Sequence, residues 1–398
     1  MRLLMKKFLK RASLLILTLA ILGVGTLLIA GPGIVEKGRN QVIEHSPYPV
    51  SVAAQTLHDS LLIGDWHADS LLWNRDLTER GTRGQVDIPR LIEGNVSIQV
   101  FTAVTKSPAG LNYDSNSAEA WDNITTLAMV QLWPFRTWDS IFERAVYQAD
   151  RLHGFEAAAP GSLIVIKSLA DLEEVLTRRA AGEAIVGGIL GIEGSHPLEG
   201  DLANLQRLQD AGYRLISLQH FFDNALGGSL HGEANSGLTD FGRQVVTAVV
   251  ERGLILDLAH SSQQVARDVL EMTDIPLIVS HTGTYGHCAV KRNFPDDLMQ
   301  AIAATGGVIG IGYWQEVVCD NSPAGIAAAI KAAISIVGED HVSLGSDFDG
   351  SVSTTFDTSE LAALTHELLE QGVTEPQIRK VMGENMLRVL RERFAIIP

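Results

Sequence analysis

The sequence predicts an α/β fold: a TIM (β/α)8 barrel with a helical insertion after the second strand, preceded by an N-terminal transmembrane helix. Three observations predict it. Short runs rich in Val, Ile and Leu alternate with amphipathic stretches along the chain. Eight such runs fall within residues 61–398, a length that suits one barrel with one large insertion. An uncharged segment, residues 12–35, follows a basic N-terminus.

The N-terminal segment has the charge pattern of a membrane anchor. The first eleven residues hold five cations and no acid, whereas the whole chain has a formal charge of −16. As a helix, Ala12 to Ala30 would span roughly 28 Å, close to the hydrocarbon thickness of a bilayer. Cations flanking a span stay in the cytoplasm, so we expect the rest of the chain on the exported side, periplasmic or extracellular.

A cleaved signal peptide is the alternative for this segment. Its apolar region would be shorter and would end in a small-x-small site, which Leu28-Ile29-Ala30 matches poorly. We therefore expect four parts in the chain. They are a cytoplasmic basic segment (1–11), a transmembrane anchor or signal sequence (12–35), a linker containing Pro47 and Pro49 (36–60) and the barrel (61–398).

The expected strands are dense in branched apolar residues rather than alternating, as is typical of parallel strands buried on both faces. They are Leu62–Ile63, Ser97–Val104, Ile185–Ile192, Arg214–Leu218, Leu254–Leu258, Pro276–Val279, Val308–Ile311 and Val342–Leu344. Amphipathic stretches such as Phe241–Arg252 and Ala324–Val337 separate them. A doubly wound open sheet is the alternative, but no G-x-G-x-x-G follows the first strand.

The insertion covers residues 105–183 and holds three of the six tryptophans, Trp121, Trp133 and Trp138. An aromatic-rich excursion could be a lid, a membrane-facing surface or an oligomer contact. Packing of the added helices on the barrel is the simplest interpretation, and we favour it.

Residues of metal-ligand type follow six of the eight strands. They are His67 and Asp69, Glu193, His220, His260, His281 and Asp347. Because the C-terminal ends of parallel barrel strands open on one face, these side chains should converge there. Three imidazoles with an Asp and a Glu suit transition metals, Zn²⁺ first, and five ligands exceed the three that one catalytic zinc takes. We therefore expect two metal ions.

Other polar residues near strand ends need no catalytic role. We expect Asp65, Asp257 and Asp349 to cap the helices that follow, because a single Asp after a strand usually does so. We also expect five histidines that follow no strand to lie at the surface: His45, His58, His153, His231 and His366. The acidic body argues against nucleic-acid binding, and the 46% hydrophobic content excludes a disordered chain.

From Leu61 to about Leu390 the chain resembles the membrane dipeptidase (renal dipeptidase, peptidase M19) family of the metal-dependent amidohydrolase superfamily. The motifs that carry the resemblance are His67-x-Asp69, Glu193-Gly194-Ser195-His196, Asp257-Leu258-Ala259-His260, Ser280-His281, Lys291-Arg292-Asn293-Phe294-Pro295, Gly345-Ser346-Asp347-Phe348-Asp349-Gly350 and Gly383-Glu384-Asn385. His-x-Asp at the first strand, rather than His-x-His, points to this branch of the superfamily.

The resemblance implies a dinuclear zinc site. One Zn²⁺ would take His67 and Asp69, the other would take His260 and His281, and Glu193 would bridge both. The expected reaction is dipeptide hydrolysis by a metal-bridging hydroxide. His220 would bind substrate and stabilise the oxyanion, and Asp347 would orient the nucleophile or carry its proton.

The resemblance further assigns Arg292 as the residue that binds the terminal carboxylate of the substrate. A surface ion pair with Asp296 or Asp297 is the alternative for this arginine. Family likeness also implies a disulfide between Cys288 and Cys319, for which two free buried thiols are the alternative, and a possible homodimer.

Three functions remain open at this point. The first is a membrane-anchored dipeptidase, which could accept a D-residue at the C-terminal position. The second is a metal-dependent amidohydrolase acting on N-acyl amino acids or β-lactam-like amides, which Arg292 would suit equally. The third is a non-catalytic envelope binding protein, which we disfavour because no expected ligand is missing.

Overall fold

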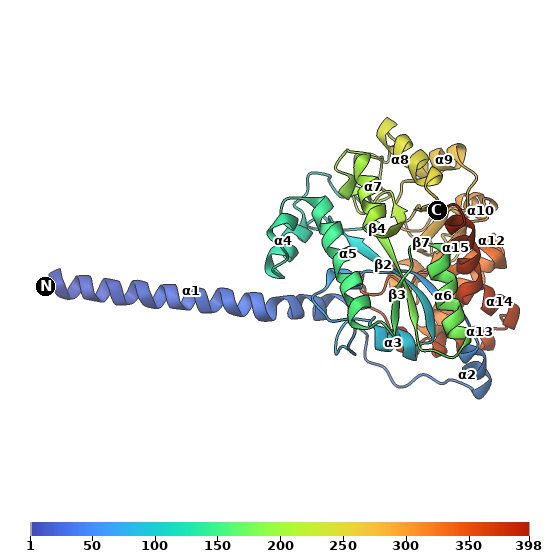
Figure 1. Ribbon diagram of the computed structural model, residues 1–398, viewed down its shortest axis with the longest axis horizontal. Coiled ribbons are helices and arrows are strands. Elements are labelled where there is room, and N and C mark those ends of the chain that lie inside the picture. Colours follow the sequence, from blue (N-terminus) through green and yellow to red (C-terminus); the bar gives the residue numbers. More distant parts are fainter. Residues whose placement is uncertain (1, 398) are drawn as a thin grey trace.

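Eight parallel strands close into a barrel in the computed structural model, which describes residues 2–397 (Figure 1). The barrel strands are β1 (Ile63–Ala68), β2 (Val96–Val104), β4 (Val186–Glu193), β5 (Tyr213–Ser217), β6 (Ile255–Asp257), β7 (Ile278–Thr282), β8 (Val308–Ile311) and β9 (Val342–Leu344). Each pairs with its neighbours in chain order, and the pairing of β2 with β4, for example Phe101 with Leu190, completes the ring. The predicted TIM barrel and all eight predicted strands are confirmed.

The barrel strands are buried along their whole length, which explains their dense apolar sequences. Helices cover the outside: α3 (Ile88–Glu93), α7 (Ala203–Asp210), α8 (Asp240–Glu251), α9 (Gln263–Met272), α10 (Asp296–Ala304), α11 (Gln315–Val318), α12 (Pro323–Val337), α13 (Ala362–Glu370), α14 (Glu375–Arg379) and α15 (Asn385–Phe394). Several begin at a capping hydroxyl. Thr239, Ser262 and Ser322 each accept a hydrogen bond from a first-turn amide.

The insertion after β2 contains a strand in addition to the helices that we predicted. It contains α4 (Asn123–Val130), α5 (Ile141–Ala158), α6 (Leu169–Ala180) and a strand that we did not predict, β3 (Leu163–Val165). β3 pairs with residues 186–188 of β4, whereas β5 pairs with residues 190–192 of the same strand. β3 is therefore an extra strand outside the closed ring. β3 has three residues and no residue of metal-ligand type at its end, so its sequence could not be distinguished from that of a loop.

Buried polar contacts fix α5 to the barrel. The Arg144 guanidinium donates to the carbonyl oxygens of Thr105 and Trp138, and the Tyr213 hydroxyl of β5 donates to the Ala145 carbonyl. Of the three tryptophans in the insertion, Trp133 is buried whereas Trp121 is 65% exposed.

The N-terminal helix α1 (Arg2–Arg39) projects away from the barrel as a single rod (Figure 1). Among the described residues, it is the one helix long and apolar enough to cross a membrane, a test that a signal sequence also passes. It continues past residue 35 because its last turns dock on the barrel. Glu36 is buried and pairs with Arg75 and Arg83, and the Asn40 side chain accepts from the Ser351 amide.

The segment predicted as a linker, residues 36–60, is therefore more ordered than expected. α1 runs to Arg39, and α2 (Val52–Asp59) packs against α13. Between them, Val42 bridges to Thr354, and the Tyr48 hydroxyl donates to the Thr355 carbonyl. These partners lie more than 300 residues away in sequence, so local composition could not predict the order.

A disulfide joins Cys288, in the loop after β7, to Cys319, at the end of α11. This is the pairing that the family resemblance implied. The alternative of two free thiols is wrong.

Candidate metal centre and substrate pocket

The residues of metal-ligand type meet around one carboxylate at the C-terminal end of the barrel. Glu193, the last residue of β4, lies within hydrogen-bonding or coordinating reach of four imidazoles. The distances from their Nε2 atoms to its carboxylate oxygens are 3.4 Å for His67, 3.2 Å for His220, 3.2 Å for His260 and 3.5 Å for His281. Asp69 and Asp347 approach His67 Nε2 at 3.4 and 3.8 Å. All seven side chains are buried.

Backbone geometry at the strand ends turns these side chains inward. His220, His260 and Asp347 are each the third residue past β5, β6 and β9. His260 and Asp347 have left-handed backbones, with φ of 62° and 59°. Such a conformation is costly for residues other than glycine and is concentrated at functional sites. The fold therefore holds strain where the candidate site lies.

Ser280 and Asp257 orient two of the imidazoles. The Ser280 hydroxyl donates to Asp257 Oδ2 at 2.7 Å, which leaves its lone pairs facing His281 Nδ1 at 2.9 Å and His67 Nδ1 at 3.3 Å. Each ring can donate its Nδ1 hydrogen to this oxygen and present Nε2 to the centre. This is the arrangement expected of histidines that bind a metal.

The charge balance of the centre calls for added cations. Asp69, Glu193 and Asp347 place three carboxylates together in a buried space, and burial together with the Asp69 charge raises the pKa of Glu193. Burial, with the charges of neighbouring carboxylates, also raises the pKa of Asp347. Buried like charges are unfavourable unless a cation lies among them.

Three sets of side chains offer ligand atoms close enough to share an ion. They are His67, Glu193 and His281; Glu193, His220 and His260; and His67, Asp69 and Asp347. His67 Nε2 is buried without a hydrogen-bond partner among the described residues. The donor set, N and O atoms at the base of a pocket, fits a divalent transition metal.

The imidazoles differ in their electrostatic surroundings. Burial opposes protonation of His67, but the carboxylates of Glu193 and Asp69 outweigh it and raise its pKa to about 10. Burial lowers the pKa of His220 to about 4 and also lowers that of His260 and His281. His220, His260 and His281 are therefore neutral at neutral pH, and a cation bound among the carboxylates would take the place of the proton on His67.

Arg292 lies inside the pocket and not at the surface. It is buried, its Nη2 donates to the His281 carbonyl at 2.8 Å, and the guanidinium lies 5.8 Å from the Trp314 ring centre. Its Nε is buried without a hydrogen-bond partner among the described residues. The alternative of a surface ion pair is wrong, because Arg292 is buried, Asp297 pairs with Arg267 at 3.0 Å and Asp296 accepts from the Gly286 amide. A guanidinium with a free donor at the base of a pocket suits a carboxylate ligand.

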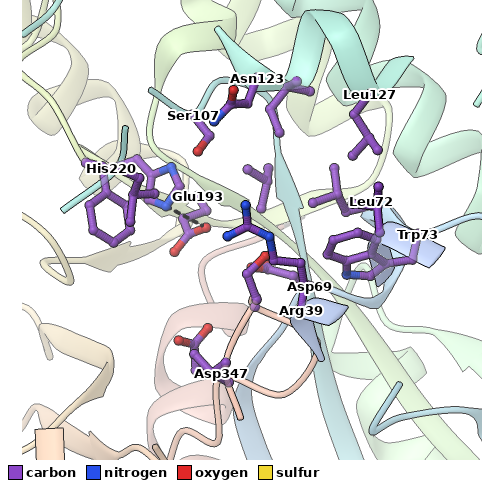
Figure 2. Close-up of a pocket in the computed structure, with 18 of the residues that line it drawn as sticks. Arg39, Asp69, Leu72, Trp73, Ser107, Asn123, Leu127, Glu193, His220 and Asp347 are labelled. Atoms are coloured by element: carbon purple, nitrogen blue, oxygen red, sulfur yellow. Dashed lines mark ion pairs between the residues drawn. The ribbon is translucent and has the colours of Figure 1, made fainter. Parts of the chain in front are cut away.

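A cavity of about 500 Å³ opens above this centre. Its base holds Asp69, Glu193, His220, His260, Arg292 and Asp347. In Figure 2, His220 and Glu193 lie on one side, Leu72, Trp73 and Leu127 lie on the other, and Arg39 lies between them. The walls come from the insertion, through Ile124, Leu127 and Val130, and from the end of α1, through Pro32, Val35 and Arg39.

Sequence reasoning missed several residues in the pocket or next to it. Tyr113 lies in the insertion, and its hydroxyl accepts from Trp314 Nε1 at 3.0 Å. His231, expected at the surface, is buried and stacks on Phe221 with its ring centre 5.6 Å from that of His260. Trp314 had a usable signal, since it stands three residues past β8, whereas Tyr113, His231 and Arg39 follow no strand.

The remaining expectations on polar residues concern His58 and the aspartates near the strand ends. His58 is also buried, between Thr365 and the Gly94 carbonyl, so its placement at the surface is wrong. Asp65 and Asp257 accept backbone amides of the strand ends, His67 N and Ala259 N among them, and neither caps a described helix, so the expected helix-capping role is wrong. Asp349 accepts from the Gln85 amide and pairs with Arg75, which links the site to the docking region of α1.

Comparisons with known proteins agree with this geometry. Residues 52–395 match the membrane dipeptidase family (peptidase family M19). Dipeptidase aclJ of Aspergillus oryzae is 28% identical over 372 residues, which cover 86% of this chain and 82% of the fungal protein.

Two crystal structures share the fold. The probable dipeptidase PvdM of Pseudomonas aeruginosa has a TM-score of 0.71 at 20% identity and covers 86% of this chain and 98% of its own. A metallopeptidase of Rhodobacter sphaeroides, liganded with a phosphinate mimic of the dipeptide L-Ala-D-Ala, has a TM-score of 0.67 at 24% identity, covering 84% and 99%. Because the family match spans most of the sequence, the chain belongs to the membrane dipeptidase family, peptidase family M19, and is a metal-dependent hydrolase of peptide bonds.

Proposed function

We propose that this protein is a zinc-dependent dipeptidase, anchored by α1 with its barrel on the exported side of the membrane, and that its substrates include dipeptides with a D-residue at the C-terminal position. The observation that carries the proposal is one buried carboxylate, Glu193, within 3.5 Å of four imidazole Nε2 atoms at the base of a cavity that also holds Arg292. The ligand of the Rhodobacter relative, a mimic of L-Ala-D-Ala, supports the stereochemical part.

Two Zn²⁺ ions are the cofactors in this proposal. His67 and Asp69 would hold one, His260 and His281 would hold the other, and Glu193 would be a ligand of both. When bound, such a pair supplies Lewis acidity and lowers the pKa of water, which provides a nucleophile at neutral pH. The Thr102 hydroxyl, which donates to Asp69 Oδ1 at 2.5 Å, and Ser280 keep the ligands in place.

The chain positions the substrate through two side chains. Arg292 binds the terminal carboxylate with the donors that its buried position leaves free, which fixes the register of the peptide bond. His220 is held by a contact of 3.1 Å between its Nδ1 and the Lys106 carbonyl, so its Nε2 faces the centre. Because the Lys106 carbonyl takes the Nδ1 hydrogen, His220 must be protonated at Nε2 as well to bind the scissile carbonyl and stabilise the charge that develops on that oxygen.

Asp347 transfers the proton in this proposal. Its carboxylate lies 3.8 Å from His67 Nε2, and burial raises its pKa, so it can accept a proton and release it again. It orients the attacking water and transfers a proton to the leaving amine. Glu193 acts by holding the centre together.

Metal removal tests the proposal directly. We expect a chelator to abolish dipeptide hydrolysis by the full-length protein and Zn²⁺ to restore it, with the far-ultraviolet circular dichroism unchanged in all three states. Elemental analysis of the active protein should find two zinc ions per chain. Undiminished turnover by metal-free protein would refute the metal-dependent reaction, and restoration only by another metal would refute zinc.

A substrate panel separates the dipeptidase from an amidohydrolase of N-acyl amino acids or β-lactam-like amides, because both reactions could use Arg292. We expect Arg292→Ala to lower kcat/KM for dipeptides by about 30-fold or more, equivalent to about 2 kcal/mol. Arg292→Lys should recover part of this loss. Amidating the C-terminus of the dipeptide should impair the parent enzyme as much as Arg292→Ala does. Equal turnover of free and amidated dipeptides, or faster turnover of N-acyl amino acids, would count against the proposal.

A further inference from the structure

The insertion carries an exposed apolar patch beside the base of α1. Its members are Trp121, Met129, Leu132 and Phe135, which are 65%, 39%, 63% and 78% exposed, and we refer to them as the membrane-side patch. Large apolar side chains grouped on a surface mark a site of interaction with a protein or a membrane. Metal binding and catalysis use none of these four residues.

Local structure holds these side chains outward. Leu132 has a left-handed backbone, with φ of 56°, which is unfavourable for a leucine and places it beyond the end of α4. Trp121 Nε1 donates to Thr126 Oγ1 at 3.1 Å, and the Phe135 ring packs edge-on against Trp138, 4.6 Å between centres. The patch is therefore a fixed feature of the fold and not an unstructured loop.

The position of α4 along α1 identifies what faces the patch. A Cβ atom on Gly31 would lie 3.7 Å from Val130 Cγ1, so α4 touches α1 one residue past the apolar span, which ends at Ala30. Figure 1 shows α4 reaching further along α1, toward the N-terminus, than the barrel behind it. The patch thus lies at the depth where the hydrocarbon layer around α1 would end.

The base of α1 is fixed to the barrel, so this depth is fixed too. Glu36 pairs with Arg75 and Arg83, and Arg75 also pairs with Asp349. Lys37, which is exposed, follows in the same turn, at the level expected for lipid phosphates.

We propose that the membrane-side patch inserts into the interfacial layer of the bilayer that α1 spans. The proposal rests on membrane anchoring by α1. Apolar and aromatic side chains are favourable at this depth, about 5–10 Å into the boundary between headgroups and acyl chains, and Trp is enriched there. Because α1 and α4 also wall the active-site cavity, the cavity would then lie next to the lipid surface.

Site-directed spin labelling of the full-length protein can test this contact. Cys288 and Cys319 are joined in a disulfide, so an introduced cysteine would be the one reactive thiol among the described residues. We would label Leu132→Cys in the patch, Leu19→Cys within the apolar span and Val52→Cys, which is 85% exposed on α2. Collisions with oxygen, which concentrates in lipid, and with a water-soluble nickel complex would be measured in phosphatidylcholine and phosphatidylglycerol vesicles and in nanodiscs holding one chain each.

We expect the label at 132 to lose most of the nickel accessibility seen at 52 and to gain oxygen accessibility, as at 19. If the label at position 132 is as accessible to nickel as the label at position 52, while the label at position 19 is protected, the proposed contact is wrong and the membrane anchor stands. Exposure of 19 would overturn both. Protection of 132 in crowded vesicles but not in single-chain nanodiscs would show that a second copy covers the patch, which also overturns the proposal. Dipeptide turnover by each labelled variant reports that the barrel is folded.

Discussion

The rim of barrel strand ends and the wall formed by α1 and α4 both line the same cavity, but they are built differently. Rim residues are buried and polar, and Ser280 links several of them through its contacts with Asp257, His67 and His281. The wall is mainly apolar, is partly exposed and combines segments from two ends of the fold. In the proposed function, the rim performs the chemistry, whereas the wall selects and admits the substrate.

The family match sharpens this contrast. It begins at residue 52, so it covers the rim and α4 but not α1. The rim therefore belongs to the shared framework of the family. The part of the wall that α1 contributes, Pro32, Val35 and Arg39, lies outside the matched residues.

The largest difference between rim and wall should appear at Asp347. We expect Asp347→Asn to lower kcat by about 10² to 10⁴, the usual contribution of a general acid or base, because the amide cannot accept the proton. KM and metal content should change little. Steady-state kinetics with elemental analysis checks this, and a variant that lost its metal together with its activity would instead make Asp347 a ligand.

An intermediate effect, on metal affinity, is expected at Ser280, whose hydroxyl contacts two of the proposed histidine ligands. Ser280→Ala removes the oxygen that faces His67 Nδ1 and His281 Nδ1, so we expect metal affinity to fall about 10- to 100-fold. Excess metal should restore kcat, because no group that touches substrate is changed. Competition with a chelating dye measures the affinity, and Ser346→Ala, a buried hydroxyl that donates to the His67 carbonyl, is the matched control. An equal loss of affinity in both variants would show general loosening of the site.

The smallest effect should come from the wall. Arg39 lines the cavity, and no ion-pair partner for it occurs among the described residues, so it can attract an acidic substrate side chain. We expect Arg39→Ala to raise KM for dipeptides with Asp or Glu by about fivefold at most, the range of an exposed charge pair, and to leave neutral dipeptides unchanged. Lys37→Ala, two residues earlier on α1, should change neither. A loss of kcat for all substrates in Arg39→Ala would break the division between rim and wall.

Most of the rim could be predicted because each residue immediately follows an apolar run that could be recognised. Glu193 and His281 stand within their strands, and His220, His260 and Asp347 stand three residues beyond theirs. His231 and Tyr113 could not be found in this way, since they reach the site through loops whose course depends on contacts with Phe221 and Trp314. β3 was missed because three apolar residues within an insertion look the same in a strand as in a loop.

By itself, the sequence determined the barrel, its eight strands, the apolar N-terminal span and the set of residues at the strand ends. These follow from local patterns, apolar density and strand-end position, which physical chemistry translates into structure with little reference to the rest of the chain. Only the tertiary structure decided that Arg292 is buried and not in a surface ion pair, and that α1 continues to Arg39 and walls the pocket. Those outcomes depend on charges and surfaces that meet across hundreds of residues, as Glu36 meets Arg75 and Arg75 meets Asp349.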